Sequence, residues 1–325
     1  MTTKQKELYE LLKQEITLLD LAKYLNLSPK LAYNRVQTLK NQGYNVYRKD
    51  FSTGDIQFSI KNYLDDDSDE NILYTLPNDN FLRVVVLSDA HIGNSLQRLD
   101  FLEKTYNYCI NNNIHTIFNC GDLLNGLLSS SRGSIIKKDY EKQINFFLKN
   151  YPFDSRIINF TILGNHDRDF YNGGFDLKQL LNMKRFDIKV LGYEDSSIKI
   201  KNDKIRLIHP IDKNFGTFAN NSKIIFRGHS HESKIKTVGG DNMICSYVPS
   251  SCDMFYRDGY AYPGMFDVII LFNTKGIINE ITINSLIYID KFVKVGEFCR
   301  GLLAPEQYNS VKYEETPKKL HKKRK

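Results

Sequence analysis

The chain has 325 residues, of which 41% are hydrophobic and 26% charged, as in soluble globular proteins and unlike disordered ones. No apolar run approaches the ~20 residues that cross a bilayer, and the start of the sequence lacks the apolar stretch of a signal peptide. The five cysteines are widely spaced and form no CxxC pair, which favours reduced thiols. We therefore expect a cytoplasmic protein with no membrane partner.

Positive charge is unevenly distributed along the sequence. The net charge is +7, and six positive charges lie within residues 318–325. Residues 1–62 carry ten Lys or Arg against six Asp or Glu, whereas residues 63–80 carry six acids and no base. Segregated basic regions indicate contacts with an acidic partner, for which nucleic acid is the usual candidate.

The first sixty residues predict three helices and a hairpin. Apolar residues at helical spacing mark the helices, of which the second begins at Thr17. The third begins at Ser28, whose side chain can cap it, and ends at Gly43. Alternating apolar residues on both sides of Gly54 then predict two strands joined by a turn.

This order of elements resembles a winged helix-turn-helix, a module whose third helix enters the DNA major groove. The resemblance predicts a winged helix-turn-helix domain over residues 1–62 that binds nucleic acid, with DNA favoured. The side chains expected to make the contact are Lys30, Tyr33, Asn34, Arg35, Gln37, Lys40, Arg48 and Lys49. The alternative is a docking module whose polar face is merely solvated.

The rest of the chain predicts a linker, a larger domain and a tail. Residues 63–80 are acidic and contain Pro77, as expected of a linker. From residue 81, buried strands alternate with helices and are followed by mostly short strands, a pattern that favours two packed sheets flanked by helices over residues 81–300. Residues 301–325 are predicted to be a basic tail that binds phosphate without reading sequence, or directs nuclear import.

Short polar clusters, most of them containing histidine, follow the predicted strands. They read SDAH, CGD, GNHD, IHP and GHSH in chain order. Ligands of open α/β sheets bind at the carboxyl ends of strands, because loops from several strands converge there. The sequence therefore predicts a single site built from these five clusters.

The series DAH, GD, GNHD, H and GHSH resembles the calcineurin-like metallophosphoesterase superfamily over roughly residues 81–290. The resemblance implies an α+β fold, in which helices flank a two-sheet β-sandwich, and two divalent metal ions. One ion is expected to bind Asp89, His91, Asp122 and His231, and the other Asp122, Asn165, His209 and His229. Imidazole and oxygen ligands without thiolate favour Mn²⁺, or else Fe or Zn, over Mg²⁺ and Ca²⁺.

The resemblance also implies a mechanism. A hydroxide that bridges the metal ions is expected to attack phosphorus in line. His166 is expected to protonate the leaving oxygen as general acid, and Asp167 to orient the ring of His166.

We expect a phosphodiesterase that acts on nucleic acid, because a phosphoesterase centre is combined with a winged-helix module and a basic tail. The motif set is similar to that of the double-strand-break repair nucleases, although the chain lacks their long helical insertion and reads GDLLNG at the second motif. One alternative is a phosphomonoesterase, or a phosphatase of phosphoproteins or cyclic nucleotides, with a regulatory amino-terminal module. Another is a DNA-binding regulator whose second domain is not catalytic.

Overall fold

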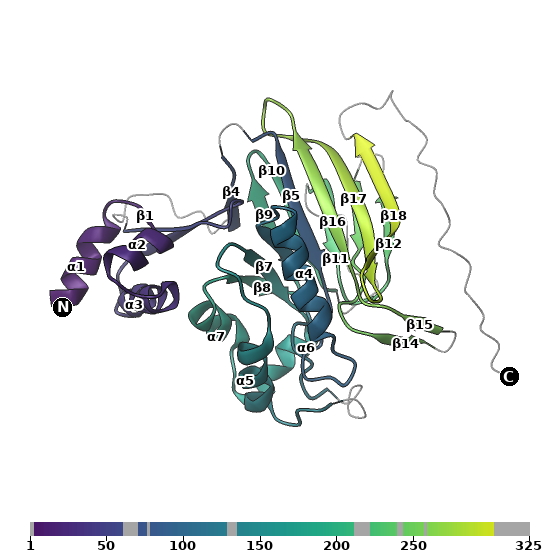
Figure 1. Ribbon diagram of the computed structural model, residues 1–325, viewed down its shortest axis with the longest axis horizontal. Helices are drawn as coiled ribbons and strands as arrows, with labels where there is room; N and C mark the ends of the chain where they lie inside the picture. Colours follow the sequence, from purple (N-terminus) through teal and green to yellow (C-terminus); the bar gives the residue numbers. More distant parts are fainter. Residues whose placement is uncertain are drawn as a thin grey trace.

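A computed structural model describes residues 3–60, 71–76, 79–128, 135–210, 222–238, 243–256 and 259–301 of the chain. Within these residues, two large sheets form the centre of the molecule and helices flank them. A small helical module at the amino terminus projects from one side of this body (Figure 1). The predicted α+β fold of two packed sheets with flanking helices is confirmed.

The seven-stranded sheet provides one half of the site. Its parallel strands are joined by crossover helices, so their carboxyl ends lie at one edge of the sheet. The strand order is β18 (Phe292–Gly301), β17 (Ile278–Tyr288), β16 (Gly264–Phe272), β5 (Phe81–Leu87), β6 (Thr116–Asn119), β7 (Ile158–Leu163) and β8 (Ile188–Tyr193). The crossovers contain α4 (Leu99–Asn111), α5 (Tyr140–Asn150) and α7 (Leu177–Lys184).

The nine-stranded sheet provides the other half and also includes strands of the amino-terminal module. Its order is β1 (Ile16–Thr17), β3 (Ile56–Ile60), β2 (Val46–Phe51), β4 (Asn71–Tyr74), β9 (Asp195–Ile200), β10 (Asp203–Ile208), β11 (Ile224–Arg227), β13 (Met243–Tyr247) and β12 (Lys234–Val238). A separate hairpin consists of β14 (Met254–Tyr256) and β15 (Gly259–Ala261).

Side chains of β5 alternate between two cores. Leu82, Val84 and Val86 belong to the core shared with strands of the second sheet, whereas Val85 and Leu87 pack with α4, α5 and α7. Both faces of β5 are therefore covered, which explains why its sequence is continuously apolar rather than alternating.

The amino-terminal module contains the predicted three helices and hairpin. The helices are α1 (Thr3–Leu12), α2 (Leu18–Tyr24) and α3 (Pro29–Asn41). The Thr17 hydroxyl oxygen accepts a hydrogen bond from the Asp20 backbone N–H at 3.1 Å, and Ser28 caps α3 in the same way. Gly43 follows α3 with a φ of 91°, a left-handed conformation that favours glycine.

The segment predicted to be a linker contains strand β4 instead. This strand pairs in parallel with β2 on one side and with β9 on the other, and Leu73 in it is fully buried. It therefore joins the hairpin of the module and the second sheet into one continuous sheet. The other linker residues at 63–70 and 77–78 lie outside the described part of the chain, as does the predicted tail beyond Gly301.

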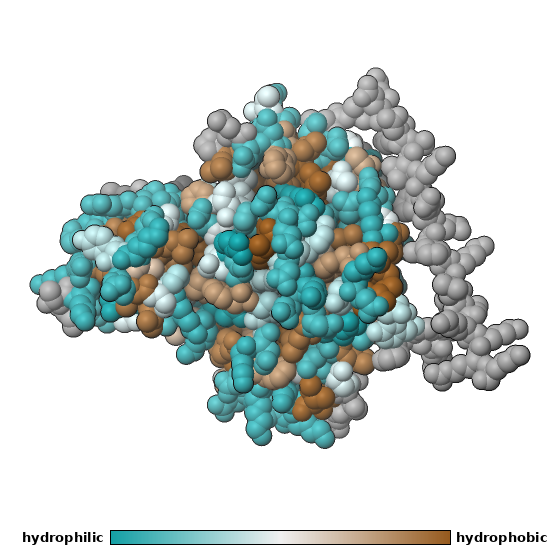
Figure 2. Space-filling model, in the orientation of Figure 1, coloured by the Kyte–Doolittle hydropathy of each residue, from teal (hydrophilic) through white to brown (hydrophobic). Residues whose placement is uncertain are grey.

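The surface in Figure 2 is largely hydrophilic, with scattered apolar side chains. In the part of the chain that the structure describes, none of the helices combines the length and apolar character that crossing a bilayer requires.

Candidate metal centre

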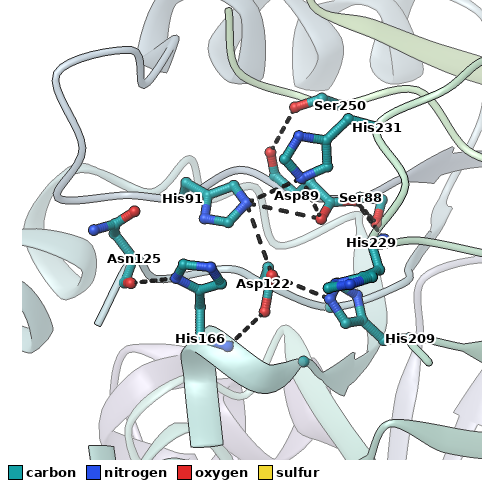
Figure 3. A network of polar contacts seen from close by, with 12 residues as sticks. Ser88, Asp89, His91, Asp122, Asn125, His166, His209, His229, His231 and Ser250 are labelled. Carbon is teal, nitrogen blue, oxygen red and sulfur yellow. Dashed lines mark hydrogen bonds and ion pairs between the residues drawn. The ribbon is translucent and has the colours of Figure 1, made fainter. Parts of the chain in front are cut away.

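The five sequence clusters meet where the two sheets come together. Asp89 and Asp122 lie in the loops that follow β5 and β6, and Asn165 begins the short helix α6 (Asn165–Arg168) that follows β7. These three strands are neighbours in the first sheet. His209 and His229 follow β10 and β11, which are neighbours in the second. Figure 3 shows the labelled carboxylates and imidazoles of these loops converging on one centre. The sequence prediction that these loops converge is confirmed.

One cluster of potential ligands consists of Asp89, His91 and His231, whose ligand atoms lie within 4.8 Å of one another. Nε2 of His231 lies 3.0 Å from Oδ1 of Asp89 and 3.4 Å from Nε2 of His91. Nε2 of His91 in turn lies 3.7 Å from Oδ2 of Asp122. Asp122 therefore borders this cluster.

The second cluster consists of Asp122, His209 and His229, again with ligand atoms within 4.8 Å of one another. Nε2 of His209 lies 3.1 Å from the same oxygen of Asp122, Oδ2. Oδ1 of Asn165 is buried and has no hydrogen-bond partner among the described residues. A buried oxygen without a donor is costly unless another group satisfies it, and a cation is one such group. Asp122 is placed to be shared by the two clusters.

Hydrogen bonds fix which nitrogen of two imidazoles faces the centre. Nδ1 of His209 lies 2.6 Å from the Cys120 carbonyl oxygen, and Nδ1 of His231 lies 3.1 Å from the Met254 sulfur. A carbonyl or a thioether only accepts, so each Nδ1 carries a proton, and in the neutral ring each Nε2 presents its lone pair to the centre. Met254 has no counterpart in the sequence motifs, and nothing in the sequence around it pointed to this contact.

The backbone at the centre is strained. Asp89, His91, Asp122, His229 and His231 have φ values of 56°, 44°, 53°, 72° and 56°, all in the left-handed region. Each such conformation costs a non-glycine residue on the order of 1–3 kcal/mol, and such residues cluster at functional sites.

Two glycines of the motifs are needed because the loops pack closely. A Cβ atom on Gly164 would lie 2.2 Å from Oδ1 of Asp122. One on Gly228 would lie 2.3 Å from the Ser88 hydroxyl oxygen and 2.8 Å from Nδ1 of His209. All three distances are far below van der Waals contact, so only glycine lets these loops approach the ligand groups.

The carboxylates and imidazoles of the centre stabilise each other's charged forms. Burial by itself would raise the pKa of Asp122, but His209 and the other imidazoles lower it to about 2. Burial would lower the pKa of His209, but the carboxylates of Asp122 and Asp89 raise it to about 10. The negative potential that holds a proton on His209 would equally favour a cation, whose binding displaces protons from its ligands.

His166 stands beside the two clusters. Its Nδ1 donates a hydrogen bond of 2.6 Å to the Asn125 carbonyl oxygen, and its backbone N–H donates one of 2.9 Å to Oδ1 of Asp122. A ring nitrogen of His166 lies within 4.8 Å of ligand atoms of His91 and Asp122. Burial lowers the pKa of the His166 ring, which favours its neutral form.

The predicted role of Asp167 in orienting the His166 ring is wrong. Oδ2 of the fully buried Asp167 accepts hydrogen bonds from the backbone N–H groups of Gly164 at 2.9 Å and Leu123 at 3.1 Å. Oδ1 accepts a third, from Leu124 at 2.9 Å. Asp167 therefore ties the loop after β6 to the loop after β7, while the Asn125 carbonyl orients the His166 ring. Burial and the charge of Asp122 raise the pKa of Asp167 to about 7.

Two residues predicted to contact nucleic acid are part of the packing instead. Tyr33 is 2% exposed, its ring lies 5.9 Å from that of Phe186, and its hydroxyl donates to the Asn182 carbonyl oxygen. The Arg48 guanidinium donates to Asp50 and to the Phe186 carbonyl oxygen, both at 2.7 Å. The prediction is wrong for both, because the face that they occupy packs against the larger domain.

The other predicted contacts remain at the surface to different degrees. Lys40 is exposed and Arg35 is half-buried. Lys49 forms an ion pair of 2.6 Å with Glu15. Lys30, Asn34 and Gln37 line a cleft between α3 and the larger domain.

Comparison with solved structures finds chains of low similarity. A predicted phosphoesterase from Streptococcus pneumoniae TIGR4 is 17% identical in sequence, with 68% of this chain and 98% of that chain covered and a TM-score of 0.37. The phosphoesterase Yfce from E. coli is 15% identical, with 61% and 96% covered and a TM-score of 0.35. The nuclease MPE from Pseudomonas putida is 14% identical, with 57% and 84% covered and a TM-score of 0.30.

Among curated proteins, none matches the sequence significantly. The model of the calcineurin-like phosphoesterase family matches residues 82–216, which include the clusters from DAH to IHP. Residues 82–216 of the chain are therefore similar to the calcineurin-like phosphoesterase domain.

Proposed function

We propose that the chain is a metal-dependent phosphodiesterase that cleaves nucleic acid. The observation that carries this proposal is the meeting of two ligand clusters at Asp122, together with the buried Oδ1 of Asn165, which has no hydrogen-bond partner among the described residues. Neutral imidazoles, carboxylates and an amide oxygen are a donor set that suits Mn²⁺, and also Fe or Zn. The residues present therefore fit a pair of divalent cations.

The ligand assignment follows the two clusters. Asp89, His91 and His231 with Asp122 would hold one cation, and Asp122 with Asn165, His209 and His229 would hold the other. When bound, such cations supply Lewis acidity that activates water and neutralises phosphate charge.

The chain's own residues contribute positioning and proton transfer. His166 is the catalytic residue assigned to the leaving oxygen, because its Nδ1–H is held by the Asn125 carbonyl and its Nε2 is left for substrate. In the neutral ring Nε2 first takes up a proton from water and then delivers that proton to the leaving oxygen. Asp167 fixes the backbone on both sides of Asp122. The Cys120 carbonyl fixes the orientation of the His209 ring.

Charge and architecture support nucleic acid, with DNA favoured, as the substrate. Residues 1–62 and 318–325 carry a positive surplus, which suits a polyanion better than a small phosphate ester. Strand β4 joins the amino-terminal module to the sheet of the phosphoesterase domain. A substrate held by the module is thereby held at a fixed position relative to the metal centre, as a polymer can be.

A substrate panel at two salt concentrations tests the proposal. Purified protein with Mn²⁺ is incubated with single- and double-stranded DNA and RNA and with bis(p-nitrophenyl) phosphate, alongside samples in EDTA and the Asp122→Asn variant. We expect cleavage of nucleic acid that stops in EDTA and in the variant, and whose KM rises steeply with salt. Cleavage of the small diester alone would refute the nucleic-acid substrate. Undiminished activity of Asp122→Asn would refute the metal assignment.

A further inference from the structure

The amino-terminal module and the phosphoesterase domain enclose a cleft of about 370 Å³. Figure 1 shows α3 and α7 facing each other at this junction. The volume lies within the range of small-ligand sites, roughly 300–1,000 Å³. Lining residues come from α3 on one side and from α5, α7 and the residue after α7 on the other: Lys30, Asn34, Gln37, Thr38, Asn41, Leu148, Met183, Lys184 and Arg185.

The lining of this cleft is cationic and contains polar side chains that have no hydrogen-bond partner within the described residues. It contains three basic residues and no acid. Arg185 is committed to Asp187 through two hydrogen bonds. Within the described residues, by contrast, the ammonium groups of Lys30 and Lys184 have no hydrogen-bond or ion-pair partner. The side-chain amides of α3 that line the cleft, those of Asn34, Gln37 and Asn41, also have no hydrogen-bond partner among these residues. These groups are available to an anionic ligand with polar edges.

The walls of the cleft are fixed relative to each other. Besides the contacts of Tyr33 and Arg48 with the larger domain, Nζ of Lys189 in β8 lies 2.9 Å from Oδ2 of Asp50 in β2. Asp50 is fully buried, so this ion pair is shielded from solvent. A cleft whose walls are already in place loses less entropy when a ligand binds.

We propose that this cleft holds one strand of nucleic acid, with Lys30 and Lys184 on backbone phosphates. This proposal rests on the proposed function, and it specifies that the enzyme binds its nucleic-acid substrate as a single strand. The α3 amides would contact sugars or base edges, and Leu148 and Met183 offer apolar surface for a base.

A duplex does not fit the same surface. The major groove of duplex DNA is about 12 Å wide, and a recognition helix can enter it only if that helix is exposed on the protein surface. The polar face of α3 instead looks into the cleft, and the adjacent face packs through Tyr33 against the segment around Asn182. A groove could receive α3 only if the module separated from the larger domain.

The test measures binding without cleavage. A fluorescein-labelled single strand of about 12 nucleotides, and the corresponding duplex, are titrated with the full chain in EDTA at several salt concentrations. The cleft variant is Lys30→Ala/Lys184→Ala. The matched control is Lys6→Ala/Lys178→Ala, which removes two exposed lysines, one from each of α1 and α7, that do not line the cleft.

Loss of two phosphate contacts lowers the salt slope of single-strand binding by about 1.4, which corresponds to about 25-fold weaker binding at 0.1 M salt. We expect this loss in the cleft variant, less than twofold change in the control, and tighter binding of the single strand than of the duplex by wild-type protein. Equal affinities of the two variants, or tighter binding of the duplex, would overturn the proposal even if nucleic acid is cleaved. Cleft-dependent binding of the strand without any cleavage would instead refute the proposed function and leave this inference standing.

Discussion

Replacement of Asp167 by asparagine separates two roles for the carboxylate next to His166. In the structure this carboxylate accepts three backbone hydrogen bonds, from Leu123, Leu124 and Gly164. An asparagine side chain has one oxygen, which can keep the two bonds now made by Oδ2. Its NH₂ group would then face the N–H of Leu124, and two donors cannot bond to each other.

The cost follows from this lost bond. A hydrogen bond to a charged group contributes about 1.5–3 kcal/mol, and a buried N–H left without an acceptor costs about 1–3 kcal/mol. These two free energies describe the same lost hydrogen bond, so they are not added together. The neutral amide also avoids burying a charge, a cost that is visible in the raised pKa of Asp167. At pH 8, where the native carboxyl is ionised, these two effects oppose each other. At pH 4 the native carboxyl, with a pKa of about 7, is protonated, so the cost of burying a charge is nearly absent, and we expect the free energy of unfolding to fall by about 1–3 kcal/mol.

Urea denaturation in EDTA measures this change, with Asp290→Asn at an exposed position as the control. The control is expected to change stability by less than about 0.5 kcal/mol. Turnover of bis(p-nitrophenyl) phosphate by Asp167→Asn should fall by less than about tenfold, because the Asn125 carbonyl still holds the His166 ring. Unchanged stability combined with a loss of turnover above 100-fold would refute this reasoning and restore Asp167 as the group that orients the ring.

Three further substitutions test other parts of the structure. His166→Ala should retain both cations and lose turnover by about 10²–10⁴-fold; metal analysis and kcat measure this, and loss of metal would identify His166 as a ligand. Met254→Leu removes the acceptor for Nδ1 of His231 and should weaken metal binding by about tenfold; an unchanged affinity in chelator competition would show that the contact orients nothing. Asp50→Ala leaves two partly buried cations unpaired and should lower the free energy of unfolding by about 3–5 kcal/mol; a loss in urea denaturation as small as that of Asp290→Asn would contradict this estimate.

The metal centre was largely predictable because its chemistry is local in sequence. Each cluster combines a buried strand with polar residues at its carboxyl end, and strand order in a parallel sheet brings such ends together. Neither the meeting of the two sheets nor the left-handed backbone at Asp89 and His229 is visible in a motif. Both depend on contacts between segments more than a hundred residues apart.

The wrong predictions share a physical origin. The family resemblance assigns Asp167 to the ring of His166, but neighbouring residues in a helix do not face each other. Tyr33 was placed on the solvent side of α3 because one apolar face already accounted for the helix. The second buried face exists only because α3 also packs against the larger domain. Strand β4 was missed because its four residues follow an acidic run, and its pairing partners lie far away in sequence.

Titration of metal-free protein with Mn²⁺, followed by calorimetry, tests the central claim most directly. Two ligand clusters that share Asp122 predict two Mn²⁺ bound per wild-type chain, and Asp122→Ala should bind neither ion tightly because both clusters lose an oxygen. Wild-type protein that binds no Mn²⁺, or an alanine variant that still binds two ions with wild-type affinity, would contradict the account.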